Sequence, residues 1–115
     1  DLRVRTVAKD STRKISIIQA IDRRVALDDL AESKGMSMEE ILEEIEAIVY
    51  SGTRLNINYF IEEVVDPDEE EEIYDYFKTA ENDNIQTAME VLGYDDYDEL
   101  HVRLVRIKFQ SELGN

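Results

Sequence analysis

The fold is decided by residues Leu27–Gly52, which read LDDLAESKGMSMEEILEEIEAIVYSG. Ala31, Gly35 and Ile41 stand at the spacing of a helix-turn-helix. The alanine lies inside a short first helix, the glycine makes the turn, and the isoleucine returns the second helix onto the first. Glycine suits the turn because it tolerates a positive φ. This stretch therefore predicts one helix over about 27–34 and a second over about 38–50.

The second of these helices has the wrong charge for reading DNA. Ser37 is expected to cap it, with Glu40 three residues later completing a capping box. Residues Met38–Val49 contain five glutamates and no lysine or arginine. In DNA-binding proteins this helix enters the major groove, where a duplex with one negative charge per ~1.7 Å of axis repels an acidic face. We therefore predict that three of these side chains do not face DNA bases: Glu39, Glu43 and Glu46.

Composition bounds the class of protein. A chain of 115 residues with 43% hydrophobic and 36% charged residues fits one globular domain with a modest core. It has no cysteine, which excludes disulfides and thiolate chemistry. No apolar run approaches the ~20 residues of a membrane span, and no signal peptide opens the chain. We expect a cytoplasmic protein without membrane contact, and a start at Asp1 without methionine suggests a piece of a longer protein.

The net charge of −15 is unevenly distributed. Residues 1–24 carry seven basic against three acidic residues, whereas residues 55–115 carry four basic against seventeen acidic ones. This balance argues against a nonspecific nucleic-acid clamp and indicates that any phosphate contact should come from the N-terminal quarter. The candidate DNA-binding residues are Arg13, Lys14, Arg23, Arg24 and Arg54. Pairing of these side chains with nearby glutamates is the alternative interpretation.

The remaining patterns predict an all-α fold of about six helices. Further helices are expected over about 12–23 (capped by Ser11), 67–79 (Asp66), 84–92 (Asp83) and 99–112 (Asp98). Alternation over 55–59 suggests a short strand. No partner strand follows it, so the wing of a winged helix is expected to be reduced or absent.

We expect a linker or short strand over 1–11 and a single helical domain over 12–115, with a helix-turn-helix half (12–60) and an acidic helical half (61–115). The last helix, apolar on two faces, should be packed by both halves. The expected core contains Ile18, Ile21, Leu30, Ile41, Ile45 and Ile48.

No pattern in the chain predicts catalysis, a cofactor or a metal site. Asp66-x-Asp68 and Asp95-Asp96-x-Asp98 lack the glycine and glutamate positions of a calcium loop. His101 is the only histidine, and a lone helical histidine is more often structural than catalytic. The four glycines are isolated and form no phosphate-binding loop. The tyrosines and phenylalanines could stack on single strands, but at helical spacing we favour a role in the core.

The chain also resembles a known family. The segment IDRRVALDDLAESKGMSMEEILEEIEAIVYSGTRLNINYFIEEV, with RLVRIKFQSELG near the end, resembles the C-terminal helix-turn-helix region of RecQ-family ATP-dependent DNA helicases, particularly the long bacterial form of the Bacteroidetes type. The resemblance covers roughly residues 12–115. It implies a parent 3′-to-5′ helicase in recombination and repair, associated with the bacterial nucleoid, whose ATP-, Mg- and Zn-binding motifs are not in this sequence.

Two functions from different classes remain open. The first is a non-catalytic accessory module that binds DNA weakly and helps the parent helicase motor domains to engage it. The second is an acidic interaction or spacer domain that meets a basic protein partner, or the motor itself, without touching DNA.

Overall fold

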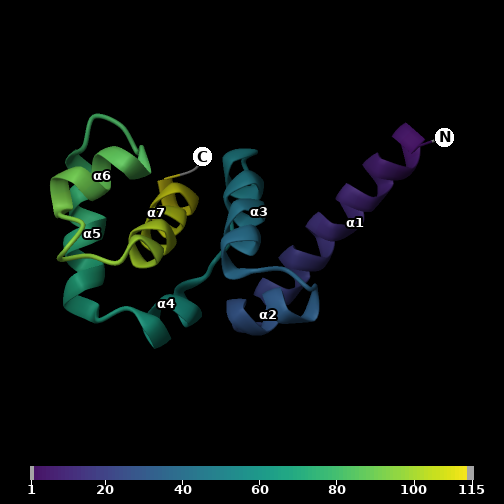
Figure 1. Cartoon of the computed structure of the whole chain (residues 1–115), viewed down its shortest axis with the longest axis horizontal. Coiled ribbons are helices and arrows are strands. Elements are labelled where there is room, and N and C mark those ends of the chain that lie inside the picture. The colour runs from purple at the N-terminus through teal and green to yellow at the C-terminus, as the bar shows by residue number, and fades with distance from the viewer. Residues whose placement is uncertain (1, 114–115) are drawn as a thin grey trace.

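The computed structural model describes residues 2–113, with side chains described over 11–113. This part of the chain contains seven helices and no strand (Figure 1). The helices are α1 (Leu2–Asp22), α2 (Leu27–Ser33), α3 (Met38–Tyr50), α4 (Asn58–Val64), α5 (Pro67–Thr79), α6 (Ile85–Leu92) and α7 (Glu99–Leu113). The predicted all-α class is confirmed, with one helix more than the six expected.

The first helix is longer than its sequence pattern indicated. It begins at Leu2, so the linker or short strand expected over 1–11 is helix from residue 2 onward, and Asp1 lies outside the described residues. Ser11 is consequently inside the helix and is not its cap. The chain has no proline or glycine before Gly35, so nothing breaks the helix in this region. In Figure 1 the N-terminal part of α1 extends away from the other helices.

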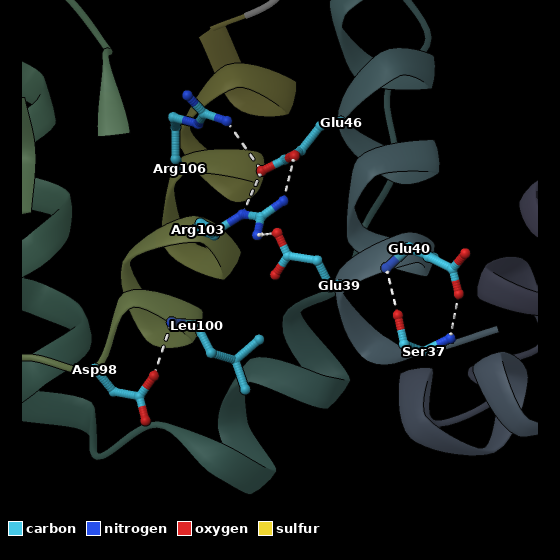
Figure 2. Close-up of polar contacts among 8 residues, drawn as sticks. All are labelled: Ser37, Glu39, Glu40, Glu46, Asp98, Leu100, Arg103 and Arg106. Carbon is cyan, nitrogen blue, oxygen red and sulfur yellow. Dashed lines mark hydrogen bonds and ion pairs between the residues drawn. The ribbon is translucent and has the colours of Figure 1, made fainter. Parts of the chain in front are cut away.

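The helix-turn-helix stretch folds as predicted. Gly35 has a φ of +66° in the turn after α2, and Ser37 caps α3. The Glu40 backbone N–H donates to the Ser37 hydroxyl oxygen at 3.1 Å, and the Ser37 backbone N–H donates to the Glu40 carboxylate at 2.9 Å. This reciprocal pair, visible at the right of Figure 2, fixes where α3 begins and how it leaves the turn.

A first hydrophobic core joins α1, α2, α3 and α4 with one face of α7. Five of the six residues predicted for the core are buried in it, whereas Ile18 is only partly buried and its neighbour Ile17 is fully buried. α1 therefore faces α3 one residue away from the predicted register. The fully or nearly fully buried aliphatic residues here include Ile17, Ile21, Leu27, Leu30, Ile41, Leu42, Ile45 and Ile57.

The strand expected over 55–59 is wrong. Leu55 and Ile57 are buried and Asn56 is exposed, which explains the alternating pattern. The segment has no strand partner, however, and the Leu55 N–H donates instead to the side-chain hydroxyl of Ser111 in α7 at 3.2 Å. The carbonyl of Ile57 accepts the first hydrogen bonds of α4. An extended peptide followed by a short helix therefore occupies the position of a wing.

The C-terminal helices begin largely as their capping residues predict. Asp66 caps α5, its carboxylate accepting from the Asp68 N–H at 2.9 Å, and Asp98 accepts from the Leu100 N–H at 2.8 Å at the start of α7 (Figure 2). The cap of α6 is Asn84, which accepts from the Thr87 N–H at 2.9 Å, and the expected cap Asp83 lies one residue too early.

α7 lies between the two halves of the molecule, as its two apolar faces predicted. Leu104 and Ile107 belong to the first core. Val102 and Val105 belong to a second core with Ile73 and residues of α6. In Figure 1 α7 runs between α3 on one side and α5 and α6 on the other. This position brings α7 against the helix that would read DNA in other helix-turn-helix proteins.

Candidate nucleic-acid interface

α3 occupies the position of a recognition helix, but most of its surface is covered. Ile41, Ile45 and Ile48 point into the first core against α1 and α2. On another side α3 contacts α7, which runs along its length (Figure 2). The side chains of α3 that remain exposed are Glu39, Glu40, Glu43, Ala47 and Tyr50. This surface contains no cation that could hold a phosphate, and its carboxylates find a donor in the major groove only at cytosine.

Two of the α3 glutamates are engaged by an arginine of α7. Arg103 is 7% exposed. Its Nε and Nη2 atoms donate to the two carboxylate oxygens of Glu46 at 3.0 and 2.8 Å, and its Nη1 atom donates to Glu39 at 2.8 Å (Figure 2). The Glu46 hydrogen bonds are the main cause of a rise in the pKa of Arg103 above its ordinary value, against the opposing effect of burial. Arg103 therefore stays positively charged, and its two partners, Glu39 and Glu46, belong to the same chain.

Arg106 extends this cluster toward α6. Its Nη2 atom donates to Glu46 at 2.9 Å, and its Nη1 atom donates to the backbone carbonyl of Asp83 at 3.0 Å. Glu46 is only 17% exposed in its side chain and bridges both arginines. The side chain of Glu39, by contrast, is 64% exposed although it accepts from Arg103, so the statement that the α3 glutamates do not face DNA bases stays a prediction.

Sequence reasoning missed the arginine cluster. A signal for it existed: Glu39 and Glu46 are seven residues apart and so share one face of α3. Arg103 and Arg106 are three residues apart on the otherwise apolar middle of α7. The two faces are complementary in charge and spacing. The sequence alone does not show that α3 and α7 pack against each other.

The structure separates the candidate DNA-binding residues into two groups. Arg13 and Lys14 lie in α1, about 15 Å along the helix axis from the turn that holds Arg23 and Arg24. Arg13 faces Glu44 of α3 at 3.6 Å, with both side chains 37% exposed, so it partly follows the alternative interpretation of internal pairing. Lys14 is exposed.

Arg23, Arg24 and Arg54 form the second group, and all three are exposed. Arg23 and Arg24 follow α1, and Arg54 lies between α3 and α4. Arg24 and Arg54 border two adjoining cavities that share Asp22 and Asn56 in their walls. Over residues 11–113, neither Arg23 nor Arg24 takes part in an ion pair. Their charges are therefore available to a partner outside the domain.

The histidine and the aromatic residues considered in the sequence analysis make contacts within the protein. His101 faces both carboxylate oxygens of Glu69 at 3.2 Å, which ties α7 to α5. The rings of Tyr74 and Phe77 pack against Phe109, consistent with the preferred role of aromatic residues in the core. Within the described residues no group of three or more histidine, aspartate or glutamate side chains could hold a metal ion. None of these helices is long and apolar enough to cross a membrane.

The three packed helices α1–α3, with a glycine turn and a capped third helix, define a helix-turn-helix domain. Residues 11–61 match the family model described as RecQ-1-like, helix-turn-helix domain. The match confirms the resemblance to the C-terminal helix-turn-helix region of RecQ helicases over residues 11–61. No curated protein matches the chain.

Proposed function

We propose that this chain is a non-catalytic accessory domain of a RecQ-like ATP-dependent 3′-to-5′ DNA helicase that acts in DNA recombination and repair. The match of residues 11–61 supports the accessory role. The motor domains of the parent helicase are its first partner, and those other domains would bind ATP, Mg²⁺ and Zn²⁺. The proposed setting is the bacterial cytoplasm, at the nucleoid.

We further propose that the domain assists DNA engagement by contacting phosphates, not base edges. The observation that carries this proposal is the pair Arg23 and Arg24, which stay exposed and outside any ion pair of the described residues in a chain with 28 carboxylates. Other cations are bound internally: Arg103 and Arg106 by Glu46, and Lys108 by Glu70 at 2.5 Å. A cation that forms no ion pair within the domain can bind a DNA phosphate and release the counterions condensed there.

Binding through so few cations must be weak and sensitive to salt. Each phosphate contacted contributes about −0.7 to −0.9 to the slope of log affinity against log salt, and the acidic half slows the approach of any polyanion. We expect measurable binding to forked DNA at low salt that is lost at physiological salt. Titration of labelled forked DNA with the wild type and the Arg23→Ala/Arg24→Ala variant tests this. Tight binding at physiological salt, or a variant equal to the wild type, would refute the assignment.

A second function is favoured by the exposed carboxylates. Glu40 and Glu43 on α3, and Asp68 and Glu71 on α5, are exposed acidic side chains that would suit a basic protein partner or the motor itself. In that case the domain acts as an interaction or spacer element without direct DNA contact. The same titration separates the two functions, because an interaction domain would show no binding to DNA even at low salt.

A further inference from the structure

Three consecutive helices of the domain end in the same backbone motif. In each, one N–H bonds back to the carbonyl five residues earlier and the preceding N–H bonds to the carbonyl three residues earlier. The pairs are Val25→Ala20 with Arg24→Ile21, Met36→Ala31 with Gly35→Glu32, and Thr53→Ile48 with Gly52→Val49. The motif requires a positive φ at its turning residue. That angle is +66° at Gly35, +108° at Gly52 and +62° at Arg24.

Arg24 is the exception among the three, because an arginine stands where the other two helices have glycine. A side chain in this backbone conformation costs free energy that glycine avoids. A Cβ added to Gly35 or Gly52 would meet no atom within 4 Å, so glycine is present there for its backbone conformation alone. Arginine stands at this position despite the unfavourable backbone conformation, and this points to a use for its side chain.

The Arg24 side chain borders a cavity of 290 Å³ between the end of α1 and the start of α4. Its other polar walls are Asp22, Asn56, Asn58, Tyr59 and Glu62, and we name this cavity the Arg24 recess. A second cavity of 400 Å³ adjoins it through Asp22, Asn56 and Asn58, with Arg54 and Lys108 on its border. Together the two cavities reach the size of sites that bind small organic groups.

The walls of the Arg24 recess combine donors, acceptors and a ring. The Asn56 side-chain oxygen accepts from the Asn58 N–H at 3.0 Å, which leaves its amide NH₂ free to donate toward a ligand. Tyr59 donates to the Val25 carbonyl at 2.5 Å, so its ring is held in place. The carboxylates of Asp22 and Glu62 would repel a free phosphate, but they accept hydrogen bonds from the amino group of a base.

We propose that the Arg24 recess holds one unpaired nucleotide of a single DNA strand, with its phosphate on Arg24 and its base edge on Asn56 and the two carboxylates. This inference rests on the proposed function, since it requires that the domain contact DNA. A base within a duplex is already paired and cannot present its edge to a recess, whereas an unpaired base can. The ring of Tyr59 adds a surface on which a base can stack.

The Arg24→Gly variant tests this without harming the fold. It installs the residue that the other two motifs use, so we expect thermal stability equal to or above that of the wild type. Affinity for a short oligo-dC strand at low salt should fall about tenfold, and affinity for a duplex of the same length about twofold. Arg23→Ala is the matched control: it removes a neighbouring exposed cation that does not line the recess, and should weaken both DNA forms alike.

A second variant pair tests the base edge. Asn56→Asp keeps the oxygen that accepts from the Asn58 N–H and replaces the donating NH₂ by a carboxylate, so single-strand affinity should fall at least about fivefold. Asn82→Asp makes the same change in a turn of the same geometry, where Asn82 accepts from the Asn84 N–H at 3.0 Å, and should leave the affinity within about twofold of the wild type. Oligo-dC should bind more tightly than oligo-dT, because thymine has no amino group to donate.

The outcomes separate the two proposals. No binding of any DNA at low salt would overturn the proposed function and this inference with it. If Arg24→Gly and Asn56→Asp weaken single strand and duplex to the same extent, the domain contacts DNA but the recess holds no unpaired nucleotide. If inorganic phosphate displaces the strand as effectively as deoxycytidine monophosphate at equal ionic strength, the recess binds phosphate alone and the inference is overturned.

Discussion

Arg103 on α7 holds both carboxylate oxygens of Glu46 on α3, although the two residues are 57 positions apart in the chain. This two-point contact is the main polar link between the helix-turn-helix part and the C-terminal helices. It also places an internal cation against the helix that other domains of this architecture offer to DNA. The chain therefore uses the acidic residues of α3 to build its own tertiary structure.

Removal of the Arg103 charge should destabilise the domain strongly. In Arg103→Met, Glu46 keeps its negative charge at a largely buried site with only Arg106 as a partner, and we expect a loss of about 3 kcal/mol in the free energy of unfolding. Urea unfolding followed by circular dichroism measures it. Lys78→Met, which breaks the exposed pair with Asp75 at 3.6 Å, is the control and should cost under about 1 kcal/mol. An Arg103→Met variant as stable as this control would contradict the role given to the pair.

Two of the α3 glutamates, Glu43 and Glu46, should respond differently to conversion to glutamine. Glu43 is exposed and no ion pair engages it within residues 11–113, so Glu43→Gln should leave stability unchanged and DNA affinity equal or slightly higher. Glu46→Gln should lower stability because it removes the charge between Arg103 and Arg106. Paired measurements of unfolding and of forked-DNA binding check both statements. Loss of sequence-specific binding in Glu43→Gln would show instead that α3 reads bases.

Ile45 should be a major contributor to the first core. It is fully buried on α3, and Ile45→Ala is expected to cost about 2–5 kcal/mol through lost burial and the cavity left behind. Ile15→Ala is the matched control, because Ile15 is also helical but 54% exposed, and it should change stability by less than about 0.5 kcal/mol. Equal losses in the two variants would show that α3 does not pack as described.

Stability should fall at high pH in part because of Tyr59. Burial, with a smaller effect from Glu63, raises the pKa of Tyr59 from 10.0 to about 12. The folded state therefore keeps a proton that the unfolded state loses, so this contribution to stability is complete below pH 10 and is lost as the pH rises from 10 to about 12. Tyr59→Phe removes the titrating group.

Urea unfolding of the wild type and of Tyr59→Phe across that interval isolates the effect. Tyr74 and Tyr97 also have a pKa raised to about 12, mainly by hydrogen bonds to Glu112 and Glu72 respectively, and both remain in the variant. The difference between the two proteins therefore reports Tyr59 alone. It should shrink steadily with rising pH, and a constant difference from pH 10 to 12 would disprove the assignment to Tyr59.

Features fixed by neighbouring residues could be predicted from the sequence. The Ser37–Glu40 capping box, the glycine turn at Gly35 and the Asp66 cap each depend on residues within three positions of one another, and all are present. The burial of α3 followed from its apolar stripe. These features follow from residues that are close together in the sequence, so they can be predicted without knowing how the rest of the chain folds.

Features that depend on distant partners could not be predicted. The alternation of Leu55 and Ile57 predicts a strand because burial on one side of an extended peptide gives the same pattern. Only the position of Ser111, 56 residues away, shows what the Leu55 amide binds. The Arg103–Glu46 contact needs the parallel packing of α3 and α7. For the candidate interface, the sequence identified Arg24 as a cation but gave no indication of its backbone conformation.

The position of α7 has a consequence for the order in which the domain acquires its structure. Leu104 and Ile107 complete the core that α1–α4 begin, yet they are separated from α3 by more than fifty residues. During synthesis the helix-turn-helix part emerges before α7, and the apolar side that α7 covers stays open until that helix leaves the ribosome. A chain interrupted after α4 would retain residues 11–61, which match the helix-turn-helix family model, and would still be prone to aggregate.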